Sequence, residues 1–195
     1  MRSRTHIVMA NALSLAIIRP NNIKELEMCI AMATIGGTIS DLDVRTSDSH
    51  KLVDFLVGIS LLFIATLYYI DYKYKFGIFD NIVNSNYIIS ILGFILFMII
   101  CFYGMHKPHR SFLHSILCLI CFASILFICF NNVYLPFVIG FISHIILDFF
   151  NKRKVKILYP FDIGISFGLC NYDGTLDTIF FIIGSITMIL LLFLC

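Results

Sequence analysis

Tryptophan is absent from this chain, and charge is scarce: Asp, Glu, Lys and Arg together make up 13% of its 195 residues. A soluble domain carries about 25% charged residues, so the sequence excludes an ordinary water-soluble fold. The 59% hydrophobic content and the 20 phenylalanines are typical of an integral membrane protein, here without the usual interfacial tryptophans. The net charge of +2 is too small to favour binding to nucleic acid.

Two further features are missing. No small-residue cleavage site follows the first apolar run, so a cleaved signal peptide is not expected. No internal repeat is evident, and we interpret residues 1–195 as a single integral-membrane domain. The 7 cysteines lie mostly inside apolar runs and are interpreted as small hydrophobic residues. Cys118 and Cys121 have the spacing of a redox or zinc pair, but no second pair accompanies them.

Five apolar segments are long enough to cross a bilayer. Each reaches about 27–28 Å at about 1.5 Å per residue, close to the roughly 30 Å hydrocarbon core. They are residues 52–70, 87–104, 112–130, 133–150 and 178–195. The shorter runs 7–18 and 26–39 form either a re-entrant hairpin or two short, partly buried helices. The sequence therefore predicts an all-α polytopic bundle, with five full spans plus a short N-terminal helical pair.

Lys and Arg in the short loops orient this bundle. Placing the run from Lys152 to Lys156 in the cytoplasm leaves only Lys73 and Lys75 in an outer loop. The first two helices contribute an even number of passes whether they cross or re-enter, so the N-terminus is cytoplasmic as well. We therefore expect a multi-pass protein of the cell (inner or plasma) membrane.

Histidines and aspartates collect where the predicted helices meet this same face. They are His6, Asp41, Asp43, His109, His114, His144 and Asp148. Because only Lys and Arg were used to set the topology, this convergence is an independent observation. Polar groups at such depth cost free energy unless they are paired or bind something. The pattern predicts a metal site at the cytoplasmic face.

The spacing of these residues suits metal ligation. His144 and Asp148 are four residues apart, which places them on one face of a helix. Mixed His and Asp ligands suit Zn²⁺, Mn²⁺ or Fe²⁺, and two clusters suit one or two ions. The predicted ligands are His6, Asp41, Asp43, His114, His144 and Asp148.

Plainer interpretations exist for the same residues. Asp148 can pair with Lys152 one turn later, and a single histidine at a helix mouth is usually an interfacial hydrogen-bonding residue. His50 and His106 are interpreted as solvated loop histidines. The later acidic residues are interpreted as loop and cap residues; they are Asp162, Asp173 and Asp177.

Four motifs occur in a characteristic order: Thr5-His6, then the run 36–43 (GGTISDLD), the run 109–115 (HRSFLHS) and the run 140–148 (GFISHIILD). In this order they resemble the YdjM family, inner-membrane proteins of bacteria and archaea described as predicted membrane-bound, metal-dependent hydrolases. Ser40 stands where that family often has Pro, and Leu113 where it often has Thr. Neither departure removes a predicted ligand.

The resemblance implies a hydrolase in which divalent ions lower the pKa of a water molecule, which becomes the nucleophile. His109 is then either a ligand or a general acid and base, and Arg110 holds a substrate anion. His144 lies about 9 Å below its helix end, within reach of lipid headgroups, so a membrane lipid or phosphoester is the expected substrate. Two rivals remain: an ion-coupled transporter that uses the cluster as a relay, and a scaffold with a structural metal.

Overall fold

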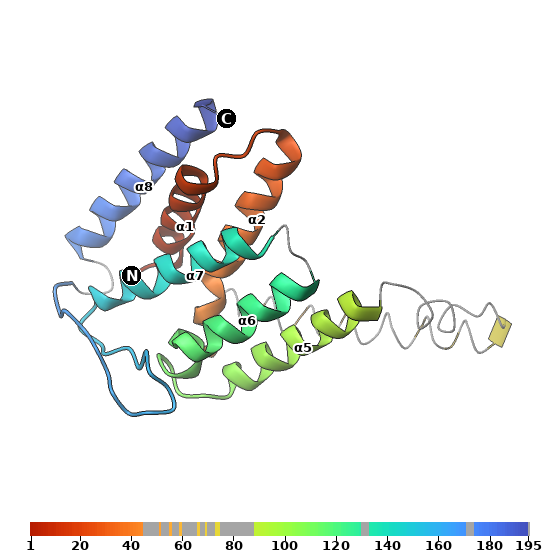
Figure 1. Cartoon of the computed structure of the whole chain (residues 1–195). Helices are drawn as coiled ribbons and strands as arrows, with labels where there is room; N and C mark the ends of the chain where they lie inside the picture. Colours follow the sequence, from red (N-terminus) through yellow and green to blue (C-terminus); the bar gives the residue numbers. More distant parts are fainter. Residues whose placement is uncertain are drawn as a thin grey trace.

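The computed structural model describes residues 1–44, 88–129, 133–170 and 174–194, together with isolated positions between 51 and 74 (Figure 1). These ranges form helices, two short 3₁₀ turns and a non-helical loop over residues 151–170, and they contain no strand. In chain order the elements are α1 (Ser3–Ile18), α2 (Ile23–Ile39), η1 (Ser40–Asp43), α5 (Ile88–Met105), η2 (Phe112–His114), α6 (Ile116–Cys129), α7 (Tyr134–Phe149) and α8 (Thr175–Leu194). The predicted all-α class is confirmed for the described residues.

The predicted boundaries agree with the observed helices to within a few residues, with one correction. The predicted span 112–130 does not begin as a helix: residues 112–114 form η2, and α6 starts only at Ile116. Ser115 explains this start, because its hydroxyl accepts a hydrogen bond from the Cys118 amide at 3.1 Å and caps the helix. The predicted span 52–70 lies outside the described residues, apart from isolated positions.

Two of the described helices, α5 and α8, are long and apolar enough to cross a membrane. Helices α6 and α7 are apolar but shorter, with 14 and 16 residues. At about 1.5 Å per residue they reach about 21–24 Å, less than the roughly 30 Å hydrocarbon core. The described residues thus show two spanning candidates where the sequence predicts four, so the five-span arrangement stays a prediction.

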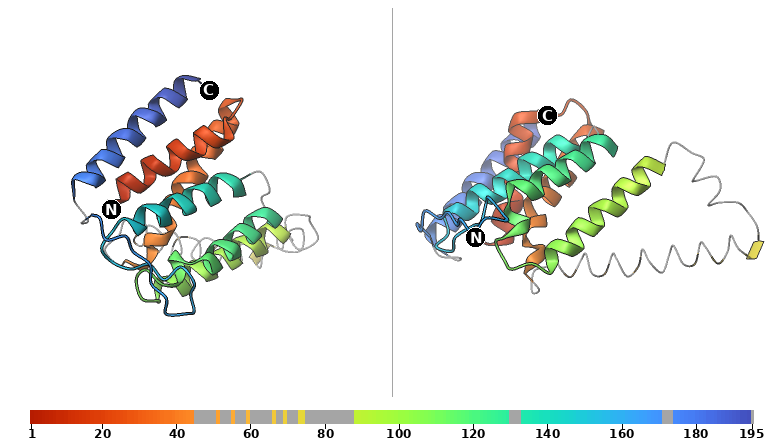
Figure 2. Two further views of the ribbon diagram at one scale, coloured as in Figure 1. Left: turned by 60° about the vertical axis from the view of Figure 1, so that its left-hand side comes forward. Right: turned by 60° about the horizontal axis from the view of Figure 1, so that its bottom comes forward.

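Of the N-terminal pair, α1 is enclosed by other helices and α2 lies at the edge of the assembly. Helix α1 packs between α2, α7 and α8, and α2 packs most extensively on α7 (Figure 2). The inward face of α1 is polar: Asn11 donates hydrogen bonds to the Ile7 carbonyl and to the Thr34 hydroxyl, both at 2.9 Å. Asn22 caps α2 by accepting from the Glu25 amide at 2.9 Å. Helices α1 and α2 are partly buried and pack on each other, which both sequence interpretations allow.

Glycines allow α2 and α7 to touch backbone to backbone. A Cβ added at Gly36 would lie 2.2 Å from the Phe137 carbonyl oxygen, and one at Gly140 would lie 2.3 Å from the Ala33 carbonyl oxygen. No larger side chain fits at either position. Small residues at a helix crossing give the close approach that membrane helices use for packing. This contact fixes the second half of α2 against the first two turns of α7.

The polar ends of the helices gather on one side of the molecule. The first residues of α1 and α8 lie beside the last residues of α7, and η1 and η2 come together below them (Figures 1 and 2). This end holds the residues singled out in the sequence. The opposite end, where α1 turns into α2, holds none of them.

Candidate metal centre

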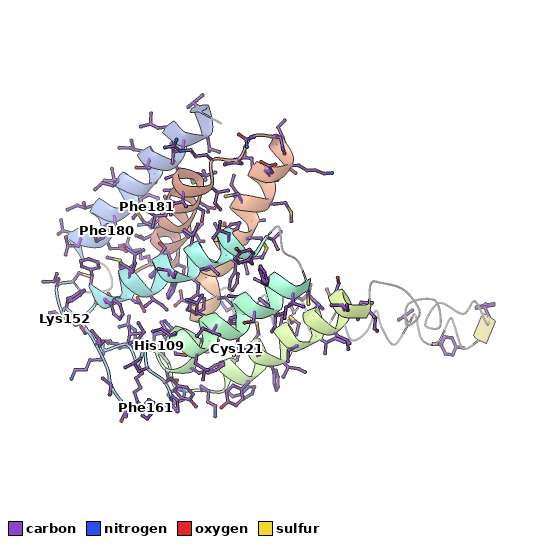
Figure 3. All side chains as sticks on the ribbon, viewed as in Figure 1. His109, Cys121, Lys152, Phe161, Phe180 and Phe181 are labelled. Carbon is purple, nitrogen blue, oxygen red and sulfur yellow. The ribbon has the colours of Figure 1, made fainter. Side chains whose placement is uncertain are left out.

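The seven histidines and aspartates predicted for the site lie in one connected cluster. They come from five separate parts of the chain: α1, η1, the connection before η2, η2 itself and α7. Figure 3 shows His109 at this end of the molecule, on the same side as Lys152 and Phe161 of the loop after α7. The His109 side chain is 30% exposed and the Asp41 side chain 17%, and the other five side chains are buried.

His144 is oriented by the backbone of α2. Its Nδ1 lies 2.8 Å from the Gly37 carbonyl oxygen. Since a carbonyl only accepts, Nδ1 carries the proton and Nε2 keeps a lone pair directed into the cluster. That Nε2 lies 3.3 Å from His114 Nε2 and 3.8 Å from Asp41 Oδ1. The ring of His6 stacks on that of His144 with centroids 4.0 Å apart. The arrangement directs the Nε2 lone pair into the cluster, as coordination of a metal ion would require.

Asp148 is the most connected carboxylate of the cluster. Its oxygens lie 3.3 Å from His114 Nε2 and 3.7 Å from His6 Nε2. Asn151 donates a hydrogen bond to Oδ1 at 2.8 Å, and the Arg110 guanidinium lies 3.3 Å away. The side chain is therefore fixed from several directions. Lys152, the alternative partner suggested by the sequence, is exposed, and Asp148 pairs instead with Arg110 and with histidines of the cluster.

Asp43 organises the other side of the cluster. It accepts hydrogen bonds from His109 Nδ1 at 2.7 Å and from the Arg110 amide at 3.0 Å, and it lies 3.5 Å from His114 Nδ1. Arg110 adopts a left-handed backbone conformation with φ 64°, unusual for a residue with a side chain. The strain is consistent with a backbone forced to present its amide to Asp43.

The carboxylates around His114 favour a positive charge at this point of the cluster. Burial disfavours the charged form of His114, but the carboxylates of Asp148 and Asp43 outweigh it and raise the pKa of His114 to about 9. Burial likewise opposes ionisation of Asp43, yet His109 and His114 hold the pKa of that carboxyl below its usual value. A cation is therefore stabilised between the two carboxylates. A divalent ion would take the place of the proton there.

Three overlapping groups of side chains have ligand atoms close enough to share an ion. The groups are His6, His144 and Asp148; then Asp41, His114 and His144; and then Asp43, His109 and His114, and within each group the atoms lie within 4.8 Å of one another. The first and third groups have no residue in common. The cluster thus has enough donors for two ions without a shared ligand.

The donor set fits a divalent metal. His6 Nδ1 is buried without a hydrogen-bond partner in the described part of the chain. Buried nitrogens in this state cost free energy, which a bound cation or water removes. The mixture of imidazoles and carboxylates suits Zn²⁺, Mn²⁺ or Fe²⁺.

Several residues lie outside the cluster, as the sequence suggests. His106 is exposed and its Nδ1 contacts the Phe102 carbonyl oxygen at 2.8 Å. Asp162 pairs with Lys156 on the surface, and Asp177 pairs with Arg2 at the start of α8. His50 and Asp173 lie outside the described residues.

Arg110 and Asn151 have roles that the sequence did not reveal. Arg110 is predicted to hold a substrate anion, but its guanidinium contacts Asp148 and the Arg153 carbonyl. In this arrangement it positions Asp148. Asn151, three residues after Asp148, is buried and supports the same carboxylate. Asn151 lies just beyond the end of α7, and the only sequence signal for it is that it follows Asp148 by three residues.

Buried polar residues at one end of an assembly with two apolar spanning candidates define a helical membrane protein. The family model of the YdjM inner membrane protein matches residues 1–195, so the chain belongs to the YdjM inner membrane protein family. This confirms the resemblance found in the sequence motifs. No curated protein and no solved structure matches the chain.

Proposed function

We propose that this chain is a membrane-bound, metal-dependent hydrolase. The observation that carries the proposal is the cluster itself: ligand atoms from five parts of the chain meet in three groups, each spanning at most 4.8 Å. Burying this many ionisable side chains costs free energy unless they bind something. The ligands are His6, Asp41, Asp43, His114, His144 and Asp148, and the ions are one or two of Zn²⁺, Mn²⁺ or Fe²⁺.

The chemistry divides between the ions and the side chains. Divalent ions polarise ester or phosphoester oxygens and make water more acidic. His109 is 30% exposed and its Nδ1 donates to Asp43, which leaves Nε2 to take up or release a proton on the open side of the cluster. A histidine backed by a carboxylate is a common general acid and base. Arg110 keeps Asp148 in place.

The membrane placement is part of the proposal. The end of the molecule that holds the cluster also holds Lys107, Arg110 and the basic residues 152–156, so it faces the cytoplasm by the positive-inside rule. The chain then crosses the inner membrane several times with its N-terminus cytoplasmic. A cluster at that face borders lipid headgroups, and a membrane lipid or phosphoester is the substrate.

Metal analysis of the detergent-purified protein tests the proposal. We expect about one or two equivalents of zinc, manganese or iron in the unsubstituted protein and loss of metal in His144→Ala and Asp148→Ala. His106→Ala is the matched control, because His106 lies at the same end but outside the cluster. Folded protein that takes up no metal, even after reloading, contradicts the proposal.

Hydrolysis is then assayed with the metal found. Phospholipids in detergent micelles are compared with soluble phosphoesters, using His144→Ala as the blank. Turnover of lipids that is lost in His144→Ala supports the lipid substrate. Turnover of soluble phosphoesters alone contradicts the lipid substrate and retains the hydrolase.

A further inference from the structure

The loop between α7 and α8, residues 151–170, exposes apolar side chains in a regular pattern. Every second residue from position 161 onward is apolar and 40 to 68% exposed: Phe161, Ile163, Ile165, Phe167 and Leu169. Alternate residues of an extended segment point to the same side, which applies to the part of this row between the turn at Phe161 and the left-handed Gly168 (φ 68°). Single exposed apolar residues are ordinary, but a continuous row of them marks a contact surface.

The same loop is basic. Lys152, Arg153 and Lys154 are exposed at its beginning. Lys156 pairs with Asp162, the one acidic residue among residues 151–170. Three cations are therefore left without an acidic neighbour inside the loop. Among the described residues these three cations form no salt bridge. A surface that combines such cations with apolar side chains is complementary to an anionic lipid layer, whose headgroups attract the cations and whose acyl chains accept the apolar groups.

The backbone of the loop is fixed by hydrogen bonds. Val155 and Ile165 exchange two of them, at 2.8 and 2.9 Å, and so join the two arms. The returning arm is attached to the end of α7, since the Phe167 amide donates to the Phe149 carbonyl at 2.7 Å. Val155 is fully buried beneath the loop. The apolar row is thus part of the folded structure.

The loop is also attached to the metal cluster. The Lys156 amide donates to the Arg110 carbonyl at 2.9 Å, and the Arg110 guanidinium donates to the Arg153 carbonyl. Arg110 in turn contacts Asp148. The loop therefore borders the cluster and precedes α8, a spanning candidate that begins at Thr175. The end of a spanning helix lies at the membrane surface.

We propose that residues 151–170 form a lipid-binding loop. Phe161 and the apolar residues after it insert into the lipid leaflet beside the cluster, while Lys152, Arg153 and Lys154 bind anionic phospholipid headgroups. The partner is the lipid surface of the protein's own membrane. This proposal is independent of metal binding and catalysis, so it can fail or succeed without the proposed function.

The absence of tryptophan allows a direct test, because one introduced tryptophan is the only one in the chain. The Phe161→Trp protein is placed in lipid nanodiscs of phosphatidylcholine, with or without phosphatidylglycerol, and quenched with brominated lipid. We expect blue-shifted emission and quenching, both stronger with phosphatidylglycerol. Emission typical of water, unquenched in both compositions, would overturn the proposal. Phe193→Trp in α8, 86% exposed, shows the response of a residue in a spanning helix.

A charge variant tests the headgroup contact. In the Phe161→Trp background, Lys152→Gln, Arg153→Gln and Lys154→Gln together should remove the extra quenching caused by phosphatidylglycerol. The matched control is Arg19→Gln with Lys24→Gln, two exposed cations at the opposite end, which should leave quenching unchanged. Quenching that is the same in both lipid compositions and in both charge variants would overturn the anionic preference.

Discussion

At the scale of single residues, His144 is held in the orientation that the proposed metal site requires. The Gly37 carbonyl accepts its Nδ1 proton at 2.8 Å and leaves Nε2 facing His114 and Asp41. Metal-binding histidines are commonly held by such a second hydrogen bond. Asn151 fixes the Asp148 carboxylate in a similar way, by donating a hydrogen bond to it. Under the proposed function, metal affinity would therefore also depend on residues that do not contact the ion.

Asn151→Ala should weaken metal binding while leaving the ligands in place. The substitution removes the 2.8 Å hydrogen bond to Asp148, and loss of such a supporting contact lowers affinity by about 10- to 100-fold. Titration of the metal-depleted protein with zinc measures the effect. Asn21→Ala, at an exposed position in the α1–α2 connection, is the control. Equal affinities in the two variants would exclude a supporting role for Asn151.

His109→Ala separates the two roles left open for His109. If His109 is a general acid and base, hydrolysis should fall by about 10²- to 10⁴-fold while the metal content stays unchanged. The measurement pairs metal analysis with an assay across pH, because removal of the titrating group also flattens the pH profile. A loss of bound metal together with activity would instead identify His109 as a ligand of the group it forms with Asp43 and His114.

At the scale of elements, short irregular turns and a close helix contact place the ligands. The 3₁₀ turns η1 and η2 carry Asp41, Asp43 and His114, and they direct these side chains inward where a continuous helix would direct some of them to lipid. Gly36 and Gly140 bring α2 onto α7, so that the Gly37 carbonyl reaches His144. Helix packing and site geometry therefore depend on the same glycines.

Gly140→Ala should weaken both the packing of α2 on α7 and the geometry of the site. The new Cβ would lie 2.3 Å from the Ala33 carbonyl oxygen, so the helices must separate, and overpacking of this kind costs about 1–3 kcal/mol of stability. We expect a lower melting temperature and weaker metal binding. Ile142→Ala, half-exposed on the outward side of α7, is the control. An unchanged melting temperature in Gly140→Ala would show that the α2–α7 contact is looser than described.

At the scale of the whole molecule, the ionisable residues of the site occupy one end of the helix assembly. The described helices carry apolar residues over much of their outer surfaces, as α5 and α8 show. A hydrolase open to one compartment fits this one-sided arrangement. An ion-coupled carrier requires access to its site from both sides.

Labelling from each side of the membrane distinguishes these possibilities. His109→Cys, at a side chain 30% exposed, should react with an impermeant maleimide in inside-out vesicles and remain unlabelled in right-side-out vesicles. Lys24→Cys, at the opposite end, should not react from the side that labels His109→Cys. The unsubstituted chain provides the background, since its described cysteines are buried or half-buried. Reaction of His109→Cys from both sides would favour the carrier.

The sequence by itself determined the helical class, most helix boundaries, the family and the residues of the cluster. These features depend on the length of apolar runs, on local capping and on the types of side chain, all of which are written along the chain. The sequence predicted too early a start for α6, because the capping residue Ser115 lies inside an apolar run. It also could not reveal the support of Asp148 by Asn151 or Arg110.

Tertiary structure alone decided which ligand atoms meet. The hydrogen bond between Gly37 and His144 joins residues 107 positions apart, and the contact between Asp43 and His109 joins residues 66 apart. Such pairs depend on the rotation and depth of one helix against another. That geometry is set by the sum of packing contacts over whole helix surfaces, including the close approach at Gly36 and Gly140, and no local stretch of sequence specifies it.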